Sequence, residues 1–158
     1  MARPNSSHSA SVSLRVLARL LAYPDPQLRA DLGDMRAALQ AEAALSRERL
    51  GELDALMQGL QRGDELQLQA DYVELFDRGR ATSLHLFEHV HGDSRDRGPA
   101  MIDLAQTYAQ AGLYLAEGEL PDYLPVVLEF ASTQPPRQVR AFLAEMAHIL
   151  NAVFNALQ

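Results

Sequence analysis

The sequence predicts an all-α fold, a single-domain bundle of about seven to eight helices. Apolar residues recur at spacings of three and four along almost the whole chain, which is the period of an amphipathic helix. No window shows the alternation of apolar and polar residues that is typical of a half-buried strand. A chain of 158 residues suits one domain with one hydrophobic core.

The chain begins with a polar, serine-rich stretch, and we expect residues 1–12 to be disordered and residues 13–158 to form the helical domain. The first apolar stripe consists of Leu14, Leu17, Leu20 and Leu21. Its helix should end before Pro24, because proline disfavours helical geometry in the residue that precedes it. Asp25 followed by Pro26 predicts the start of a second helix, with a carboxylate N-cap and proline at the first helical position.

Two further helix starts follow from capping residues. Ser46 should cap a third helix that ends at Gly59 or Gly63, and Asp64 should cap a fourth. The apolar arc of the fourth helix is wide enough to predict deep burial. It comprises Leu66, Leu68, Ala70, Tyr72, Val73, Leu75 and Phe76. Residues 77–80 then break the pattern, which predicts a loop.

The middle of the chain predicts one short helix and one longer amphipathic helix. Thr82 or Ser83 should cap the short helix, which ends at Gly92. Pro99 should open the longer one, since proline fits the first turn of a helix. Gly112 is expected to close it.

Proline residues also bound the last two helices. Pro121 and Pro125 fit the start of a helix from about residue 122 to 132, and Pro135 with Pro136 separates it from the final one. The final apolar stripe consists of Val139, Phe142, Leu143, Met146, Ile149, Leu150, Val153, Phe154 and Leu157. Because this stripe runs to the last residues without a cap, it predicts a C-terminally truncated chain or a face that meets a partner, such as a homodimer through the C-terminal helix.

The composition excludes several classes of protein. The formal net charge of -7 argues against a nucleic-acid partner, which normally requires a basic patch. The absence of cysteine excludes disulfides, thiolate metal sites and a cysteine nucleophile. The N-terminus lacks the apolar core of a secretory signal, and no apolar run approaches the ~20 residues that span a bilayer. We therefore expect a cytoplasmic protein without direct membrane insertion.

Residues 72–104 carry an unusual density of ionisable side chains. Within them, His85, Glu88 and His89 match H-x-x-E-H, a zinc-peptidase motif in which two imidazoles bind the metal and the glutamate activates water. A catalytic zinc also needs a third protein ligand. The spacing singles out none of the available glutamates, which are Glu117, Glu119, Glu129 and Glu145. The alternative is that the three residues form the solvated face of a short helix.

Two blocks of sequence carry more specific motifs. The first contains Tyr72-x-x-Leu75-Phe76-Asp77, Ser83-Leu84-His85-Leu86-Phe87-Glu88-His89, Gly92-Asp93-Ser94-Arg95-x-Arg97-Gly98 and Met101-Ile102-Asp103-Leu104. The second runs from Glu119 to Phe130. In order and spacing the chain resembles the nitrate reductase delta-subunit family of NarJ-type molybdenum cofactor assembly chaperones, roughly from Leu14 to its end. The resemblance implies an all-helical fold shared with the TorD/DmsD group of maturation chaperones.

The resemblance also implies a function without catalysis and without a cofactor of its own. Such a chaperone binds the N-terminal segment of the apo catalytic (alpha) subunit of respiratory nitrate reductase, keeps it competent for molybdenum cofactor insertion, and delays membrane docking. One departure limits the transfer: the TorD/DmsD branch typically has Asp-His where this chain has Asp122-Tyr123. The roles proposed around that histidine are therefore not carried over. A zinc peptidase and a generic helical adaptor subunit are the alternatives.

Physical reasoning favours the capture of a basic, amphipathic peptide in an apolar groove with carboxylates at its rim. The candidate rim residues are Asp77, Glu88, Asp93, Asp122 and Glu129. The candidate apolar contacts are Leu84, Phe87, Tyr114 and Tyr123, each of which would equally suit the core. His85, His89 and Arg97 complete the candidate peptide-binding set. No residue is assigned a catalytic or metal-binding role.

Overall fold

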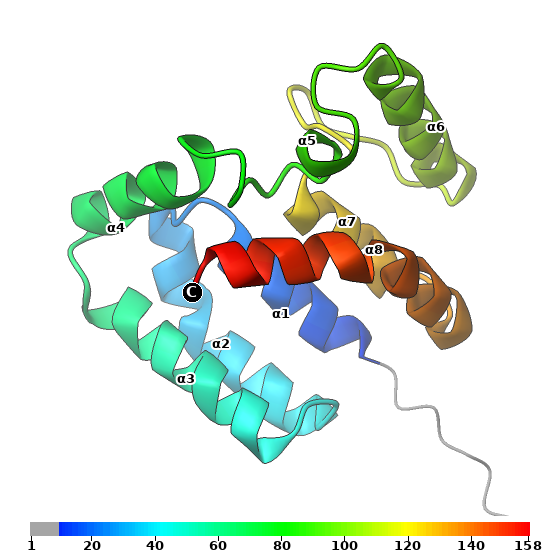
Figure 1. Cartoon of the computed structure of the whole chain (residues 1–158). Helices are drawn as coiled ribbons and strands as arrows, with labels where there is room; N and C mark the ends of the chain where they lie inside the picture. The colour runs from blue at the N-terminus through cyan, green and yellow to red at the C-terminus, as the bar shows by residue number, and fades with distance from the viewer. Residues whose placement is uncertain (1–9) are drawn as a thin grey trace, which may run out of the picture.

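A computed structural model describes residues 10–158, and the all-α prediction is confirmed for them (Figure 1). They form eight α-helices, with one π-helical turn, η1, continuing α4. The elements are α1 (Ser11–Leu21), α2 (Pro26–Glu42), α3 (Arg47–Arg62), α4 (Glu65–Tyr72), η1 (Val73–Asp77), α5 (Phe87–Val90), α6 (Arg97–Gln110), α7 (Leu124–Ser132) and α8 (Pro136–Ala156). No helix in this range is both long and apolar enough to cross a membrane.

The predicted caps of α2, α3 and α4 are confirmed. Asp25, Ser46 and Asp64 each accept a hydrogen bond from the backbone N–H three residues further on, at 2.9, 3.2 and 3.0 Å. Each bond satisfies one of the N–H groups that a helix leaves free at its start. Gly112, with φ of 82°, follows the end of α6 as expected. These boundaries were predictable because the interactions that set them are local.

The start of α1 differs from the prediction. Residues 1–9 lie outside the described part of the chain, but α1 begins at Ser11, so residues 11 and 12 are helical rather than disordered. The cause is Glu42 at the end of α2, whose carboxylate accepts hydrogen bonds from the N–H groups of Val12 and Ser13 at 2.7 and 2.9 Å. It also accepts one from the Ser13 hydroxyl at 2.6 Å. A distant side chain therefore caps this helix.

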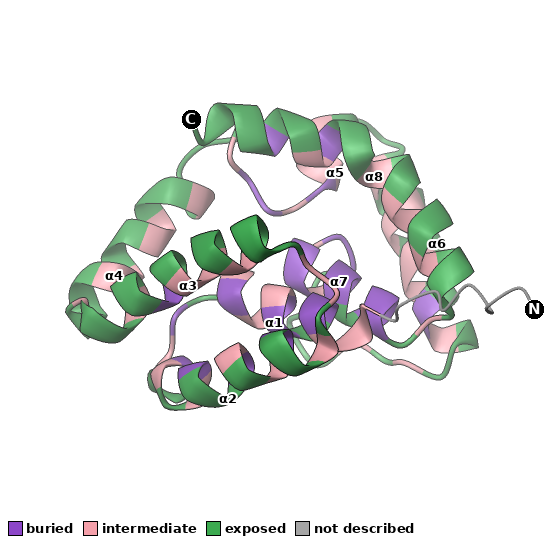
Figure 2. Ribbon diagram, turned by 90° about the horizontal axis from the view of Figure 1, so that it is seen from below, coloured by how far each residue is buried: buried purple, intermediate pink, exposed green. Residues whose placement is uncertain are grey.

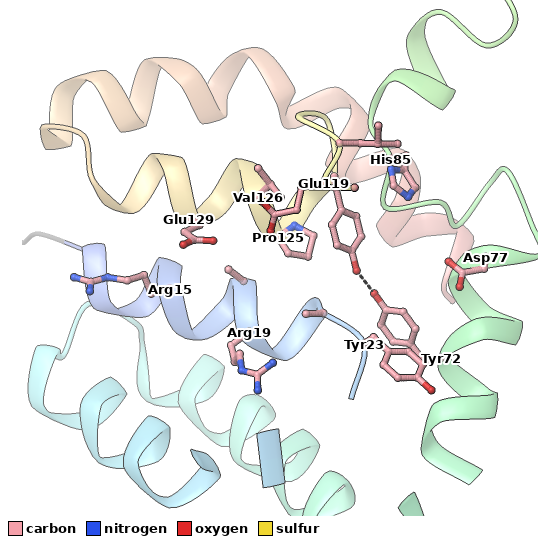
Figure 3. A pocket seen from close by; sticks show the side chains of 15 residues that line it. Arg15, Arg19, Tyr23, Tyr72, Asp77, His85, Glu119, Pro125, Val126 and Glu129 are labelled. Atoms are coloured by element: carbon pink, nitrogen blue, oxygen red, sulfur yellow. Dashed lines mark hydrogen bonds between the residues drawn. The ribbon is translucent and has the colours of Figure 1, made fainter. Parts of the chain in front are cut away.

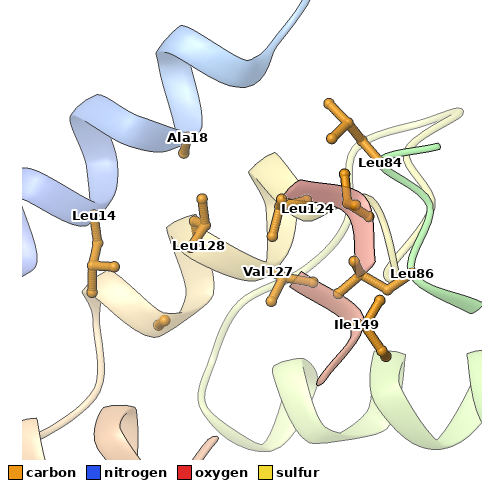
Figure 4. Packing of buried hydrophobic residues seen from close by; sticks show 10 residues of the cluster. Leu14, Ala18, Leu84, Leu86, Leu124, Val127, Leu128 and Ile149 are labelled. Carbon is orange, nitrogen blue, oxygen red and sulfur yellow. The ribbon is translucent and has the colours of Figure 1, made fainter. Parts of the chain in front are cut away.

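The hydrophobic core has two clusters, which lie on either side of α1, rather than the single one expected. The first joins α1, α7 and α8 with the segment before α5 that contains Leu84 and Leu86 (Figure 4). The second joins α1 to α2 and α3. Helix α1 uses Leu14 and Ala18 for the first cluster and Val16 and Leu20 for the second. Burial is accordingly greatest along α1 and α7 (Figure 2).

The α4–η1 segment is much less buried than its apolar arc predicted. None of its residues is fully buried, and Leu66 is 77% exposed. The segment is attached by one side only: Tyr72 and Phe76 pack against the first cluster, and the Gln69 amide donates to the carbonyl of Pro24 at 3.0 Å. The wide arc therefore leaves apolar side chains in solvent. The expectation that this helix is deeply buried was wrong.

The final apolar stripe is largely used within the molecule. Ile149 and Val153 of α8 are buried, and five of its other apolar residues pack partly against the first cluster. Phe154, by contrast, is 60% exposed and Leu157 is also exposed. Near the other end of the fold, the ring of Tyr108 on α6 lies 4.6 Å from that of Phe130 on α7. This contact anchors α6, in which Tyr108 alone is buried.

Candidate functional site

A cleft of about 610 Å³ opens between α1, the α4–η1 segment and the start of α7 (Figure 3). Four of the twelve predicted peptide-binding residues line it, namely Asp77, His85, Tyr123 and Glu129. They come from η1, from the segment before α5, from the loop before α7 and from α7 itself. The structure thus brings together residues that lie up to 52 positions apart in the chain.

Two tyrosines join the walls of this cleft. The hydroxyl oxygens of Tyr72 and Tyr123 lie 2.5 Å apart, as the dashed line in Figure 3 marks. The hydroxyl of Tyr72 donates a hydrogen bond to the carbonyl of Leu21 at 2.7 Å. The hydroxyl of Tyr123 is therefore the donor in the tyrosine pair. Burial raises the pKa of both phenols, and for Tyr72 the bond to Tyr123 adds to this effect. Both hydroxyls are therefore protonated at neutral pH.

His85 is held by the extended segment that precedes α5. Its backbone pairs with that of Tyr123 in an isolated antiparallel bridge, and the two rings stack with centroids 5.0 Å apart. The imidazole Nδ1 lies 3.8 Å from Oδ1 of Asp122, which is too long for a hydrogen bond. Neither of these two buried atoms has a hydrogen-bond partner among the described residues.

Asp122 was predicted as a rim carboxylate, and this prediction was wrong because the side chain is 0% exposed. Its Oδ2 accepts the backbone N–H of Phe87 at 3.0 Å, at the start of α5. Its backbone carbonyl accepts the N–H of Leu86, also at 3.0 Å, while the N–H of Leu124 bonds to the carbonyl of Leu84 at 2.8 Å. Asp122 therefore fastens the segment before α5 to the segment before α7 inside the protein.

The same backbone pairing explains why the short helix starts late. Thr82 or Ser83 was expected to cap it, but α5 has no side-chain cap, and the Ser83 hydroxyl instead accepts the N–H of His85 at 3.1 Å. The backbone of Leu84 and Leu86 bonds to that of Leu124 and Asp122, and α5 begins only after this pairing, at Phe87. The start of α7 moves to Leu124 for the same reason, two residues beyond the expected one.

Three of the remaining charged candidates belong to a network outside the cleft. Glu88 lies 3.3 Å from Arg97 and 4.0 Å from Arg80, and Arg80 lies 3.3 Å from Asp93. These ion pairs tie the loop after α5 to the loop after η1. Glu88 and Asp93 are thus engaged by arginines of their own chain rather than standing at the cleft rim.

The zinc-peptidase interpretation fails on the placement of its two histidines. His85 lies in the extended segment rather than on a helix with His89, and His89 uses Nε2 to bond the carbonyl of Ser83 at 2.8 Å. Among residues 10–158, no three histidine or carboxylate side chains are grouped so as to hold a metal ion. The motif therefore lacks both the shared helix and the third ligand that it requires.

The four predicted apolar contacts lie in four different environments. Leu84 is buried in the first core cluster, so it is not available at the surface. Phe87 is half-buried, with its ring edge-on to that of His91 at 5.2 Å. Tyr114 is 81% exposed and lines a second cavity beside the cleft. Only Tyr123 lies in the cleft itself.

Several cleft residues were not predicted from the sequence. Arg15 and Arg19 contribute from α1, and Glu119 contributes from the loop before α7. The two arginines resemble the solvated face of an amphipathic helix, so nothing local distinguishes them. Tyr72 was predictable in principle, since it opens the first matched block, but it was assigned to the packed arc of the fourth helix.

The charges of the cleft are unevenly compensated. Arg19 is paired with Asp25 at 2.8 Å, and this bond lowers the pKa of that carboxyl. Asp77 and Glu129 have no ion-pair partner among residues 10–158. The adjoining wall is acidic as well, because residues 64–77 contain five carboxylates and no lysine or arginine. An open cleft with a tyrosine floor and free carboxylates is suited to holding a cationic, partly apolar ligand.

The described residues thus define an all-helical protein with an open, charged cleft. The sequence model of the family described as nitrate reductase delta subunit matches residues 25–158. The chain belongs to this family, which confirms the resemblance inferred from the two sequence blocks.

Individual relatives agree with this membership. Over 147 residues the chain is 46% identical to the nitrate reductase molybdenum cofactor assembly chaperone NarJ of Escherichia coli K12, covering 93% of this chain and 62% of that protein. It is 43% identical over 137 residues to a protein of the same strain assigned as the assembly chaperone NarW, covering 87% of this chain and 56% of that one. The chain therefore spans about three fifths of the length of these curated relatives.

A solved structure shares the fold. The crystal structure of a protein assigned as a redox enzyme maturation protein, from Archaeoglobus fulgidus, superposes with a TM-score of 0.61 at 23% identity. The match covers 95% of this chain and 85% of that one. The curated relatives are named as assembly chaperones, which agrees with the prediction of a function without catalysis.

Proposed function

We propose that this chain is a system-specific chaperone that acts in the cytoplasm on respiratory nitrate reductase. It binds the N-terminal segment of the apo catalytic (alpha) subunit and supports molybdenum cofactor insertion and complex assembly before membrane docking. The observation that carries the proposal is the open cleft with unpaired carboxylates, in a member of a family whose curated relatives are named assembly chaperones. The relatives' names support the chaperone role, and the cleft supports a peptide as the ligand.

The geometry favours an amphipathic segment as the occupant of the cleft. The rings of Tyr72 and Tyr123 offer apolar surface, while Asp77 and Glu129 lie at opposite ends of the cleft (Figure 3). A basic side chain of the segment gains a charge-assisted hydrogen bond from either carboxylate. Binding of this kind is reversible, because ordering a free segment costs conformational entropy that offsets much of the contact energy.

The net charge of -7 favours the association of the chain with a basic segment. An acidic surface attracts a basic segment over distances of about 10 Å at 0.1 M salt. Calorimetric titration with the N-terminal peptide of the nitrate reductase catalytic subunit should therefore show binding that weakens as salt is added. A peptide of the same composition in scrambled order is the control. Absence of heat, together with no retention of the apo-enzyme, would contradict the proposal.

A second experiment separates a chaperone from an adaptor subunit. The tagged chain is used to retain the catalytic subunit from cells with and without molybdenum cofactor synthesis. A chaperone retains the apo-enzyme and releases the loaded enzyme, whereas an adaptor stays with both. Equal retention in the two backgrounds would contradict the chaperone role.

A homodimer through α8 remains part of the proposal. Phe154 and Leu157 are exposed near the end of this helix, which supports an apolar contact there. Sedimentation velocity over a range of concentrations tests it, with Phe154→Ser as the variant. A single monomeric species at all concentrations would exclude the dimer.

A further inference from the structure

The cleft is adjoined by a second cavity of about 320 Å³, enclosed by α6, the loop after it and α7. Its own lining is aromatic and aliphatic: Tyr108, Leu113, Tyr114, Leu115, Ala116 and Phe130. Three residues line both cavities, namely Glu119, Val126 and Glu129. The two hollows are therefore neighbours that meet along one short boundary.

That boundary carries two carboxylates, which we name the boundary carboxylates, Glu119 and Glu129. Glu119 uses Oε2 to accept the N–H of Ala116 at 2.9 Å, which fixes the side chain to its own loop. The carboxylate of Glu129 has neither a hydrogen bond nor an ion pair among residues 10–158. Arg15 lines the cleft but not the second cavity. The boundary therefore places negative charge between the tyrosine rings of the cleft and the apolar side chains of the second cavity.

The second cavity provides little for a polar ligand group to bind. The hydroxyl of Tyr108 already donates to the carbonyl of Pro121 at 2.7 Å, and burial raises the pKa of this phenol, so the group stays neutral. Apart from the boundary carboxylates, the remaining lining side chains are apolar or belong to the exposed Tyr114. A ligand side chain that enters here is favoured when it is bulky and apolar.

We propose that the two cavities form one recognition groove for a segment in which a lysine or arginine is flanked on both sides by bulky apolar residues. The cation binds at the boundary carboxylates, and one apolar side chain enters each cavity. In a helical segment, apolar residues three or four positions before and after the cation lie on the same face and so reach both hollows. This pattern deepens the proposed function, on which it rests, by specifying what the chaperone recognises.

The pattern is tested with a displayed library of random twelve-residue peptides selected on the purified chain. Enriched peptides should carry a lysine or arginine with bulky apolar residues three or four positions away on both sides. For a synthetic peptide of the enriched sequence, Glu119→Gln with Glu129→Gln should weaken binding about tenfold or more. Glu117→Gln is the matched control, since Glu117 lies in the same loop but lines neither cavity, and it should change affinity less than about twofold.

A second pair of variants tests the apolar half of the groove. Ala116→Trp fills the second cavity and should abolish the preference for an apolar residue on one side of the cation. Ala152→Trp places the same ring on an exposed position of α8 that lines neither cavity, and should leave the preference intact. Thermal unfolding of each variant establishes that the fold is retained.

The outcomes distinguish this inference from the proposed function. Failure to enrich any peptide, enrichment without a cation, or equal effects of the boundary variants and Glu117→Gln would overturn the inference. If the wild-type chain binds the N-terminal peptide of the nitrate reductase catalytic subunit while these results are obtained, the proposed function stands. If the pattern is selected but that peptide does not bind, the inference stands and the proposed function falls.

Discussion

The hydroxyl of Tyr123 donates to that of Tyr72 across a distance of 2.5 Å, and this bond connects the loop before α7 to the α4–η1 segment. The hydroxyl of Tyr72 in turn donates a hydrogen bond to the carbonyl of Leu21 at the end of α1. Three elements that are remote in sequence are thereby joined by one chain of hydrogen bonds at the floor of the cleft. The α4–η1 segment has few other attachments, so this chain matters for its position.

The order of donors predicts unequal effects of removing the two hydroxyls. Tyr123→Phe leaves Tyr72 bonded to Leu21, and should lower the free energy of unfolding by about 1 kcal/mol. Tyr72→Phe leaves both the Leu21 carbonyl and the Tyr123 hydroxyl without their partner, and should cost more. Denaturant unfolding of the two single variants and the double variant measures this. Equal costs for the two single variants would contradict the assigned direction of the bonds.

Two substitutions of Asp122 should differ in their effect on stability, because its buried carboxylate accepts a backbone hydrogen bond. Asp122→Ala leaves the N–H of Phe87 buried without an acceptor and should destabilise the protein by about 1–3 kcal/mol. Asp122→Asn retains an oxygen for that N–H, and its amide can donate toward Nδ1 of His85. The asparagine variant should therefore lose less stability than the alanine variant, as measured by thermal unfolding. A larger loss for asparagine would show that the negative charge itself is required.

Glu42 predicts a pH dependence of stability. Burial opposes ionisation of this carboxyl, but the hydrogen bonds from Ser13 and Val12 outweigh it and hold its pKa below the ordinary 4.5. A carboxyl with a depressed pKa in the folded state stabilises the protein above its unfolded-state pKa, and the contribution disappears as the pH falls through the folded-state pKa.

Glu42→Gln should therefore lower the free energy of unfolding by about 1 kcal/mol at pH 7, with the difference from the wild-type protein shrinking below about pH 4. Urea titrations at several pH values measure the difference. Asp25 has a lowered pKa as well, so only the difference between the two proteins isolates Glu42. A difference that stayed constant down to pH 2 would contradict the role of the ionised carboxylate.

Single-charge variants of the cleft should change affinity for a basic peptide in opposite directions. Asp77→Asn removes a carboxylate and should weaken binding by about threefold to tenfold, whereas Arg15→Gln removes a cation and should strengthen it by a smaller factor. The controls are Asp34→Asn and Arg47→Gln, at exposed positions outside the cleft. Calorimetry at low and high salt measures all four. Equal effects of the cleft variants and the controls would assign the binding to net charge alone.

How far the fold followed from the sequence depended on the range of the interactions. The starts of α2, α3 and α4 were correctly predicted because each is set by a cap within three residues. The start of α1 was not, since its cap is Glu42, which lies 30 positions from Val12. The late start of α5 has the same kind of cause, because residues 84–86 pair with residues 122–124 across the fold.

The candidate site was predicted only in part for related reasons. Asp77, His85, Tyr123 and Glu129 do meet in one cleft, although the sequence could not specify which residues stand opposite them. Aspartate is usually a surface residue, but Asp122 is buried. Its carboxylate has a partner in the interior, the backbone N–H of Phe87. Periodicity also overestimated the burial of α4–η1, since an apolar arc shows what a helix can bury but not what is available to cover it.

The two long walls of the cleft, α1 and the α4–η1 segment, are packed against the rest of the protein to different extents. Core clusters pack against α1 on both sides, so the wall that carries Arg15 and Arg19 is the more firmly packed of the two. The opposite wall, α4–η1, contributes no fully buried residue and is attached through a few aromatic and polar contacts. We therefore expect the α4–η1 wall, rather than α1, to adjust its position when segments of different bulk occupy the cleft.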